Sequence, residues 1–422
     1  HTTAPTSCGT MNAVYDFLED HVGVRWYWHD DLGTVVPEID TLTVPALNYD
    51  EAPRFIYRYL PYGPQEDGKQ VAKHTWGRRN RLGKSISTYH AHAFFRHLPI
   101  DEYAPEHPQY YALVDGRRVT RYYGGHHGGQ VCTTNPEVID IFADSCIEYF
   151  ERFPGRTMCA VSPNDGSGFC QCDDCRALDP GLWPEGQGRD GKPRMADRMM
   201  TFYNQIAEQT SAVFPDCTLG AYVYSYYSLP PERVKPHPNL ALVLAINSAW
   251  RGGSEEFWAE DREKIDGWAA VHDYMFMYDI LYTSGACGFP APIVEHTKAY
   301  MRHIDELGYQ GGYLYIAPTW ESLGPVAYLM SKLLWDPTAD ADAIVDAYYA
   351  DLYGEAADEV RAYEELVEKR WVAAVPHELG EPSPEAQYFL EKGGADEMRG
   401  TLLQCWRPIL DEAREMLQTG LQ

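Results

Sequence analysis

The chain has 422 residues, which is longer than one ordinary domain. Apolar residues make up 45% of it, which is enough for a sizeable core. Its formal net charge of −27 argues against nucleic acid and against an anionic membrane surface, since both require a basic patch. No run of eighteen apolar residues occurs, so we expect no membrane span. The first residues lack a signal-peptide pattern, which is typical of a cytoplasmic protein or of a secreted one whose signal has been removed.

The first fifty residues predict part of a small α/β unit. Residues 11–22 have helical apolar spacing, with Val14, Phe17, Leu18 and Val22 on one face, and the sequence GVRWYW then predicts a strand. Because too little chain precedes this strand to complete a sheet, we expect residues 1–50 to be a partial N-terminal α/β unit.

Residues 51–336 alternate between β-rich and helical patterns. The predicted strands are 55–60, 85–89, 157–161, 218–224, 240–246, 274–279 and 311–316. The predicted helices between them are 137–152, 196–213, 254–270, 291–307 and 322–335. Several strands are almost entirely apolar, as expected of a parallel sheet with both faces buried.

Seven strands over this length predict an α/β fold, a (β/α)₈ TIM-type barrel with one weak strand. An open doubly wound sheet is the alternative, although no Gly-rich phosphate loop follows the first strand. Residues 337–422 contain only helical patterns and are predicted to form a C-terminal helical domain.

The carboxyl ends of the predicted strands carry the candidate site, because active sites of such barrels lie there. Three carboxylates follow strands, Asp165, Asp279 and Glu321. Glycoside hydrolysis requires two carboxylates, one as acid and one as base or nucleophile, so these are the candidate catalytic residues. Each has a structural alternative: a turn residue in NDGSG, an arginine partner, and the first turn of a helix, respectively.

Other polar and aromatic side chains at the same predicted rim could shape a sugar pocket. Arg58 would pair with a substrate carboxylate or form a structural ion pair. We expect one of His90 and His92 to face the interior and the other to pack outward. The complete candidate substrate-binding set is Arg58, His90, His92, Asn164, Tyr222, Asn247 and Trp320.

The long insert at 90–136 and the segment after the third strand contain the cysteines of interest. The insert includes a predicted hairpin around Asp115-Gly116. Cys170, Cys172 and Cys175 form a C-x-C-x-x-C pattern, and Cys132 of the insert is the preferred fourth ligand. Four thiolates predict a closed structural zinc site with no open position for catalysis, so no catalytic cofactor is expected. Free thiols or a disulfide remain alternatives.

Several segments together resemble the domain-of-unknown-function 4838 family. They are GVRWYWHDDLGTVVP, HAFFRHLP with EHPQYYALVDGRR, QVCTTNPEV, VSPNDGSGFCQCDDCRALD and TWESLGPVAYLMSKLLWDP. The resemblance covers most of residues 11–350, and its layout is similar to that of bacterial α-glucuronidases. It implies a glycoside-hydrolase-like protein without naming a substrate.

The combined hypothesis is a glycoside hydrolase that removes a terminal sugar, acidic sugars included, from a glycan and acts from the chain end. Asp165 and Glu321 would share the acid and base roles, with Asp279 as the alternate. The expected partners are a glycan or oligosaccharide and, in a homodimer, a second copy of the chain. The alternatives are a sialidase-type hydrolase with Arg, Tyr or His in the site, a metal-dependent hydrolase using His90 and His92, and a non-catalytic glycan-binding barrel.

Overall fold

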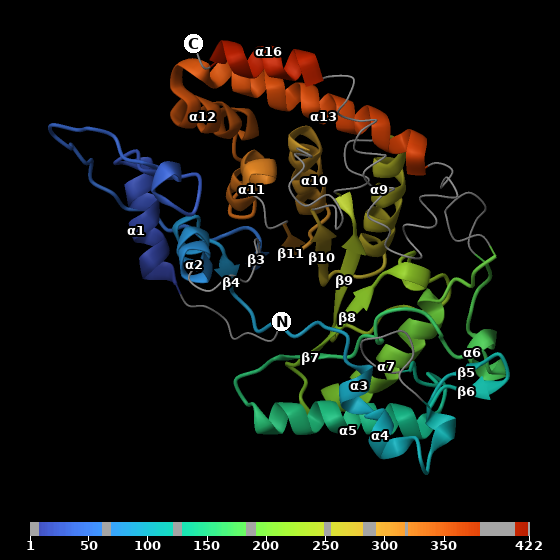
Figure 1. Cartoon of the computed structure of the whole chain (residues 1–422). Coiled ribbons are helices and arrows are strands. Elements are labelled where there is room, and N and C mark those ends of the chain that lie inside the picture. The colour runs from blue at the N-terminus through green and yellow to red at the C-terminus, as the bar shows by residue number, and fades with distance from the viewer. Residues whose placement is uncertain are drawn as a thin grey trace. The chain divides into compact units, whose positions relative to one another are not determined.

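The computed structural model describes residues 8–60, 69–120, 129–182, 191–248, 255–281, 293–316, 320–379 and 410–420 (Figure 1). Its described residues form two compact units, and each unit is described by itself. The first comprises Lys84–Ala245 and Glu263–Met277, and the second comprises Ser7–Gly83, Ile246–Arg262 and Tyr278–Gln422. The division into 1–50, 51–336 and 337–422 stays a prediction.

The helices and strands follow the sequence pattern closely. The strands are β1 (Arg25–Trp26), β2 (Thr34–Val35), β3 (Tyr57–Tyr59), β4 (Gly83–Lys84), β5 (Leu113–Val114), β6 (Arg117–Arg118), β7 (Met158–Ala160), β8 (Thr218–Val223), β9 (Leu240–Ile246), β10 (Met275–Ile280) and β11 (Gly311–Tyr315). The longer helices are α1 (Gly9–Asp20), α2 (Lys69–Arg79), α5 (Pro136–Arg152), α7 (Ala196–Val213), α9 (Glu255–Ala269), α10 (Val294–Glu306), α11 (Trp320–Leu333), α12 (Ala341–Tyr353), α13 (Ala357–Leu379) and α16 (Leu410–Gly420).

The prediction of a closed (β/α)₈ barrel is wrong. The described strands form one seven-stranded sheet in the order β4-β3-β11-β10-β9-β8-β7, and its terminal strands β4 and β7 are not paired. The β3–β11, β7–β8 and β8–β9 pairs are parallel, as the strand–helix alternation predicts. The observed architecture is therefore mixed α/β with an open sheet.

The reason lies in residues 85–89, which were predicted as a strand but belong to none. Tyr89 lies close against β8, since a Cβ added to Gly220 would be 2.5 Å from its carbonyl oxygen. Farther along, His92 forms a parallel bridge with Ser162, and the Ala93 N–H donates to the Ser162 carbonyl at 3.0 Å. These contacts do not build a ladder, so no described strand joins β4 to β7.

Helices α5 and α7 pack against each other in the first unit. The Asn135 side chain accepts hydrogen bonds from the N–H groups of Glu137 and Val138, and Pro136 occupies the first turn of α5. The apolar face of α5, which includes Phe142 and Phe150, is buried. None of the helices that the structure describes combines the length and apolar character required to cross a membrane.

Helix α1 buries acidic residues that its apolar spacing does not predict. Asp16 and Glu19 are buried, whereas Val14 is 53% exposed. The Arg81 guanidinium pairs with both carboxylates, and the Lys332 ammonium pairs with Glu19. Buried charges are tolerated when they are paired, and here the partners come from distant parts of the second unit.

We expect Lys332→Met to destabilise the protein by roughly 3–5 kcal/mol, because it leaves Glu19 buried with less compensating charge. The double variant with Glu19→Gln should lose clearly less than the sum of the single variants. Denaturant unfolding of the four proteins measures this coupling. Additive losses would contradict the assignment of Lys332 and Glu19 as an energetically coupled pair.

Candidate functional site

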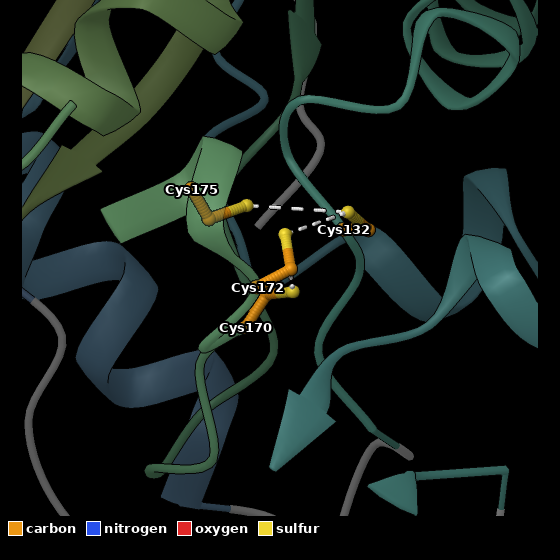
Figure 2. A group of neighbouring side chains, drawn as sticks. All are labelled: Cys132, Cys170, Cys172 and Cys175. Atoms are coloured by element: carbon orange, nitrogen blue, oxygen red, sulfur yellow. Dashed lines mark hydrogen bonds between the residues drawn. The ribbon is translucent and has the colours of Figure 1, made fainter. Parts of the chain in front are cut away.

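Four cysteine side chains converge in the first unit (Figure 2). The Sγ atom of Cys132 lies 3.7 Å from that of Cys172 and 4.0 Å from that of Cys175, and Cys170 and Cys172 are 3.4 Å apart. All four sulfurs lie within 4.8 Å of one another. These separations exceed a disulfide bond, and all four cysteines are free.

The separations fit a tetrahedral thiolate site. Four sulfurs at ~2.3 Å from a central zinc-sized ion are about 3.8 Å apart, which is close to the spacing observed here. Three of the cysteines are buried and Cys172 is half-buried. The cluster could therefore hold a metal ion, as the C-x-C-x-x-C pattern and Cys132 predicted.

The hairpin of the insert supports this cluster. Strands β5 and β6 pair around Asp115 and Gly116, both at positive φ, which confirms the predicted turn. The Leu113 N–H donates to the Cys170 sulfur at 3.3 Å, and the Leu113 carbonyl accepts from the Gln171 N–H at 2.7 Å. Backbone donors to sulfur are typical of thiolate ligands, since they stabilise negative charge.

Two hydroxyl groups and two thiols surround Cys175, the ligand on α6 (Asp173–Ala177). Its sulfur lies 3.5 Å from Thr133 Oγ1 and 3.3 Å from Thr134 Oγ1. Hydrogen bonds from the Cys132 and Cys170 thiols, with those hydroxyls, lower the pKa of Cys175. A thiolate in this position is suited to bind a cation.

A second buried group, His97 with Cys146 and Cys159, also brings potential ligand atoms together. The two ring nitrogens of His97 are already engaged, Nε2 with the Ala160 carbonyl at 2.7 Å and Nδ1 with Ser145 Oγ at 2.9 Å. Burial lowers the pKa of His97 to about 4. Because both ring nitrogens are engaged, these contacts favour a structural role for His97 over metal binding.

A second feature of the first unit is the carboxylate of Asp165, which follows β7. Its side chain is 61% exposed. The Tyr224 hydroxyl donates to Asp165 Oδ1 at 2.9 Å, and His92 Nε2 lies 3.8 Å from the same oxygen. The loop turns at Gly166 and Gly168, both at positive φ, where glycine is favoured.

The aromatic rings around Asp165 come from β8 and from the segment after β4. The Tyr222 ring contacts those of His90, His92 and Tyr224 at centroid distances of 5.5, 5.3 and 6.2 Å. The prediction that only one of the two histidines faces the interior is wrong. Residues two apart on an extended chain share a face, so both imidazoles pack on Tyr222.

The two histidines differ in their environment. His90 is buried, its Nδ1 lies 3.3 Å from the Tyr222 hydroxyl, and burial together with the Lys84 charge lowers its pKa to about 3. His92 keeps 25% of its side chain exposed, and its Nδ1 lies 2.6 Å from the Pro163 carbonyl. Because a carbonyl only accepts, Nδ1 carries a hydrogen and Nε2 faces the Asp165 carboxylate.

Asn164 links the loop of Asp165 to its neighbours. Its Oδ1 accepts from the Phe95 N–H at 3.0 Å, and its Nδ2 donates to the Gly129 carbonyl at 2.8 Å. The Gln130 side chain in turn donates to the Asn164 carbonyl at 2.6 Å. Cys132 lies two residues beyond Gln130, so the same stretch contributes to the cysteine cluster and to the anchor of the Asp165 loop.

Two predicted residues of the second unit have structural contacts. Arg58 is buried, donates to the carbonyls of Arg81 and Phe55, and lies over the Trp335 ring. Burial lowers its pKa to about 10. This corrects the prediction that Arg58 binds the substrate, because its guanidinium donates to main-chain carbonyls. Asn247 is half-buried, and its Oδ1 has no hydrogen-bond partner among the described residues.

Asp279, the alternate catalytic residue, is fully buried at the end of β10. Its Oδ1 accepts from the Ser248 N–H at 2.9 Å, and the Ser248 hydroxyl lies 2.6 Å from Oδ2. Burial raises the pKa of Asp279 to about 7, although the Ser248 hydrogen bonds oppose the shift. Trp320 and Glu321 begin α11, and their side chains lie outside the described residues.

The sequence places Tyr222 and Tyr224 together at the end of the fourth predicted strand, but the predicted substrate-binding set included only Tyr222. The signal was available, since Tyr224 lies two residues after Tyr222 and therefore on the same face of the strand.

With this geometry in hand, comparison with family models identifies the chain. A model described as Domain of unknown function (DUF4838) matches residues 28–365. The chain belongs to this family. The DUF4838 match includes the four clustered cysteines as well as His92, Asp165 and Tyr224. No curated protein matches the chain.

We expect one bound metal ion per chain in protein purified under reducing conditions. Cys132→Ser and Cys172→Ser should each weaken metal binding by at least roughly tenfold, because changes to groups that merely support ligands already have that effect. Cys217→Ser, outside the cluster, should retain the ion. Elemental analysis with chelator competition measures this, and equal retention by all variants would contradict the site.

The buried Asp279 predicts a pH dependence of stability. The pKa of Asp279 in the folded protein, about 7, lies above the ordinary value of 3.8. The stability that Asp279 contributes is therefore complete below pH 3.8 and is lost as the pH rises to about 7. Relative to Asp279→Asn, the native protein should lose up to about 1.4 kcal/mol per pH unit across this range.

Denaturant unfolding from pH 4 to pH 8 measures the difference between the two proteins. The nearby groups His296 and Asp261 are present in both, so their titration is largely subtracted. A constant stability difference at every pH would contradict the raised pKa.

Proposed function

We propose that this DUF4838 protein is a glycoside hydrolase. Among the residues that the structure describes, Asp165 would supply one of its two catalytic carboxylates. The observation that carries the proposal is the exposed Asp165 carboxylate, with a hydrogen bond from Tyr224 and the imidazole of His92 beside it. Glycoside hydrolysis requires such an accessible carboxylate together with a second one. Glu321 is proposed as its partner on the basis of the sequence.

The surrounding aromatic groups support a sugar as the substrate. Tyr224 and His92 present half-buried rings whose centroids lie 5.8 Å apart, and the buried Tyr222 ring packs against both. Aromatic faces pack against the C–H surfaces of sugars, while hydroxyl and imidazole groups bond to sugar hydroxyls. We propose removal of a terminal sugar from a glycan or oligosaccharide.

Two alternative enzymes gain less support. A sialidase-type site was expected to use Arg58 as a carboxylate clamp, but that guanidinium is buried against main-chain carbonyls. A metal-dependent hydrolase was expected to use His90 and His92, yet among the described residues neither imidazole belongs to a group of side chains that could hold a metal ion. A non-catalytic glycan-binding protein is the alternative that the experiment below decides.

We further propose that the ion of the cysteine cluster is zinc and that its role is structural. A set of four sulfur ligands favours a soft or borderline ion in tetrahedral geometry, and four thiolates leave no open position for a substrate. Cys132, Cys170, Cys172 and Cys175 would hold the ion and thereby connect the insert to the chain that follows the Asp165 loop.

The test of hydrolysis is a screen against aryl glycosides and natural glycans, including those with uronic and sialic acid termini. We expect release of one terminal sugar, and a loss of kcat of at least roughly a hundredfold in Asp165→Asn, since a positioned catalytic carboxylate contributes at least that much. Asp174→Asn, at an exposed position of α6, is the matched control and should retain activity. Glycan binding without release would instead support the binding-protein alternative.

A further inference from the structure

The Asp165 carboxylate has two unequal oxygens. Both the Tyr224 hydroxyl, at 2.9 Å, and His92 Nε2, at 3.8 Å, approach Oδ1. Among the described residues, none hydrogen-bonds to Oδ2. With 61% of the side chain exposed, Oδ2 is the oxygen that a substrate or a water molecule can reach.

The hydrogen of Tyr224 is directed at this carboxylate. A carboxylate oxygen accepts, so the phenol donates its hydrogen to Asp165 Oδ1 at 2.9 Å. Burial and the negative charge of Asp165 raise the pKa of Tyr224, so the phenol keeps its hydrogen at neutral pH.

The turn after Tyr224 holds the phenol in place. Ser225 follows with a φ of 54°, a left-handed conformation that is unusual for a residue with a side chain. The Tyr224 ring also packs edge-on against Tyr227 at 5.3 Å and against His92 at 5.8 Å. The donor is therefore fixed on both sides relative to the carboxylate.

We propose that Asp165 is the ionised member of the catalytic pair and that Tyr224 is its positioning residue. This assignment rests on the proposed function and goes beyond it, because that function left the acid and base roles unassigned. A carboxylate that accepts a hydrogen bond and faces water is suited to donate electrons, whereas a catalytic acid requires an environment that keeps its proton.

In the proposed step, the anomeric carbon forms a bond either to Asp165 Oδ2 or to the oxygen of a water molecule that gives a proton to Oδ2. The bond between the anomeric carbon and the leaving oxygen breaks, and its electron pair stays with that oxygen. The leaving oxygen takes a proton from the second carboxylic acid of the catalytic pair. Where the bond forms to Oδ2, water cleaves it in a following step.

The kinetic test compares a dinitrophenyl glycoside with an alkyl glycoside of the same released sugar. Asp165→Ala should lose activity on both substrates by a similar factor, and sodium azide should restore turnover of the dinitrophenyl substrate. A variant that lacks the catalytic acid would behave differently. It would keep activity on the dinitrophenyl glycoside, because that leaving group departs without taking up a proton. Preserved activity on the dinitrophenyl substrate alone would overturn the assignment.

Tyr224→Phe tests the positioning role. We expect kcat to fall by roughly tenfold to a hundredfold with KM nearly unchanged, and the acidic limb of the pH profile to move upward, because an ionised carboxylate that loses a donor is protonated more readily. Tyr226→Phe, which keeps its ring against Phe169, is the control and should leave both unchanged. Equal behaviour of the two variants would overturn the role of Tyr224.

A second measurement does not depend on hydrolysis. Carbon NMR of labelled aspartate, with Asp165→Asn to assign the signal, follows the titration of Asp165 in the native protein and in both tyrosine variants. A higher midpoint in Tyr224→Phe alone supports the inference even if no glycoside is cleaved, in which case the proposed function fails separately. Identical midpoints in all three proteins would overturn the inference.

Discussion

The cysteine cluster is the constraint on which the arrangement of the first unit depends. Four sulfurs within 4.8 Å of one another bring together the segment before α5, helix α6 with the residues that precede it and, through Leu113, the hairpin of the insert. The bridge between Tyr111 and Val131 joins the first of these segments to the hairpin, and a backbone hydrogen bond from Gln171 to Leu113 joins the chain before α6 to it. A metal ion shared by four thiolates would add a further restraint on all three segments.

The loop between Pro163 and Cys170 depends on this restraint at one end and on polar contacts at the other. Asn164 and Gln130 bond it to the insert, and the Pro163 carbonyl fixes His92. Gln130 and Cys132 belong to the same short stretch, so the anchor of Asp165 and the cluster share one piece of backbone. The catalytic role proposed for Asp165 requires such support, because small displacements of a catalytic group weaken catalysis.

Part of this arrangement could be predicted from the sequence because it is local or follows the order of strands. The C-x-C-x-x-C spacing places three thiols together, and Cys132 follows because the insert precedes the neighbouring strand β7. The grouping of His92 with Asp165 was predicted from strand ends, and in the structure it follows from the parallel bridge between His92 and Ser162, directly after β7.

Three of the errors share a physical origin, since they depend on contacts between residues distant in the sequence. Residues 85–89 have a strand-like composition, but their path depends on the space left by Gly220 of β8. Helix α1 has helical apolar spacing, yet it buries Asp16 and Glu19 because Arg81 and Lys332 neutralise them. Arg58 likewise follows a strand pattern, whereas its contacts with main-chain carbonyls cannot be read from spacing.

We propose that a metal ion in the cysteine cluster orders the loop that carries Asp165. Hydrogen exchange of the intact protein, with the ion bound and after its removal under reducing conditions, measures this ordering. We expect faster exchange in residues 110–119 and 162–175 after removal, with unchanged protection in β8 and β9. Equal exchange of these loops in both states, in protein shown to bind and lose the ion, would contradict it.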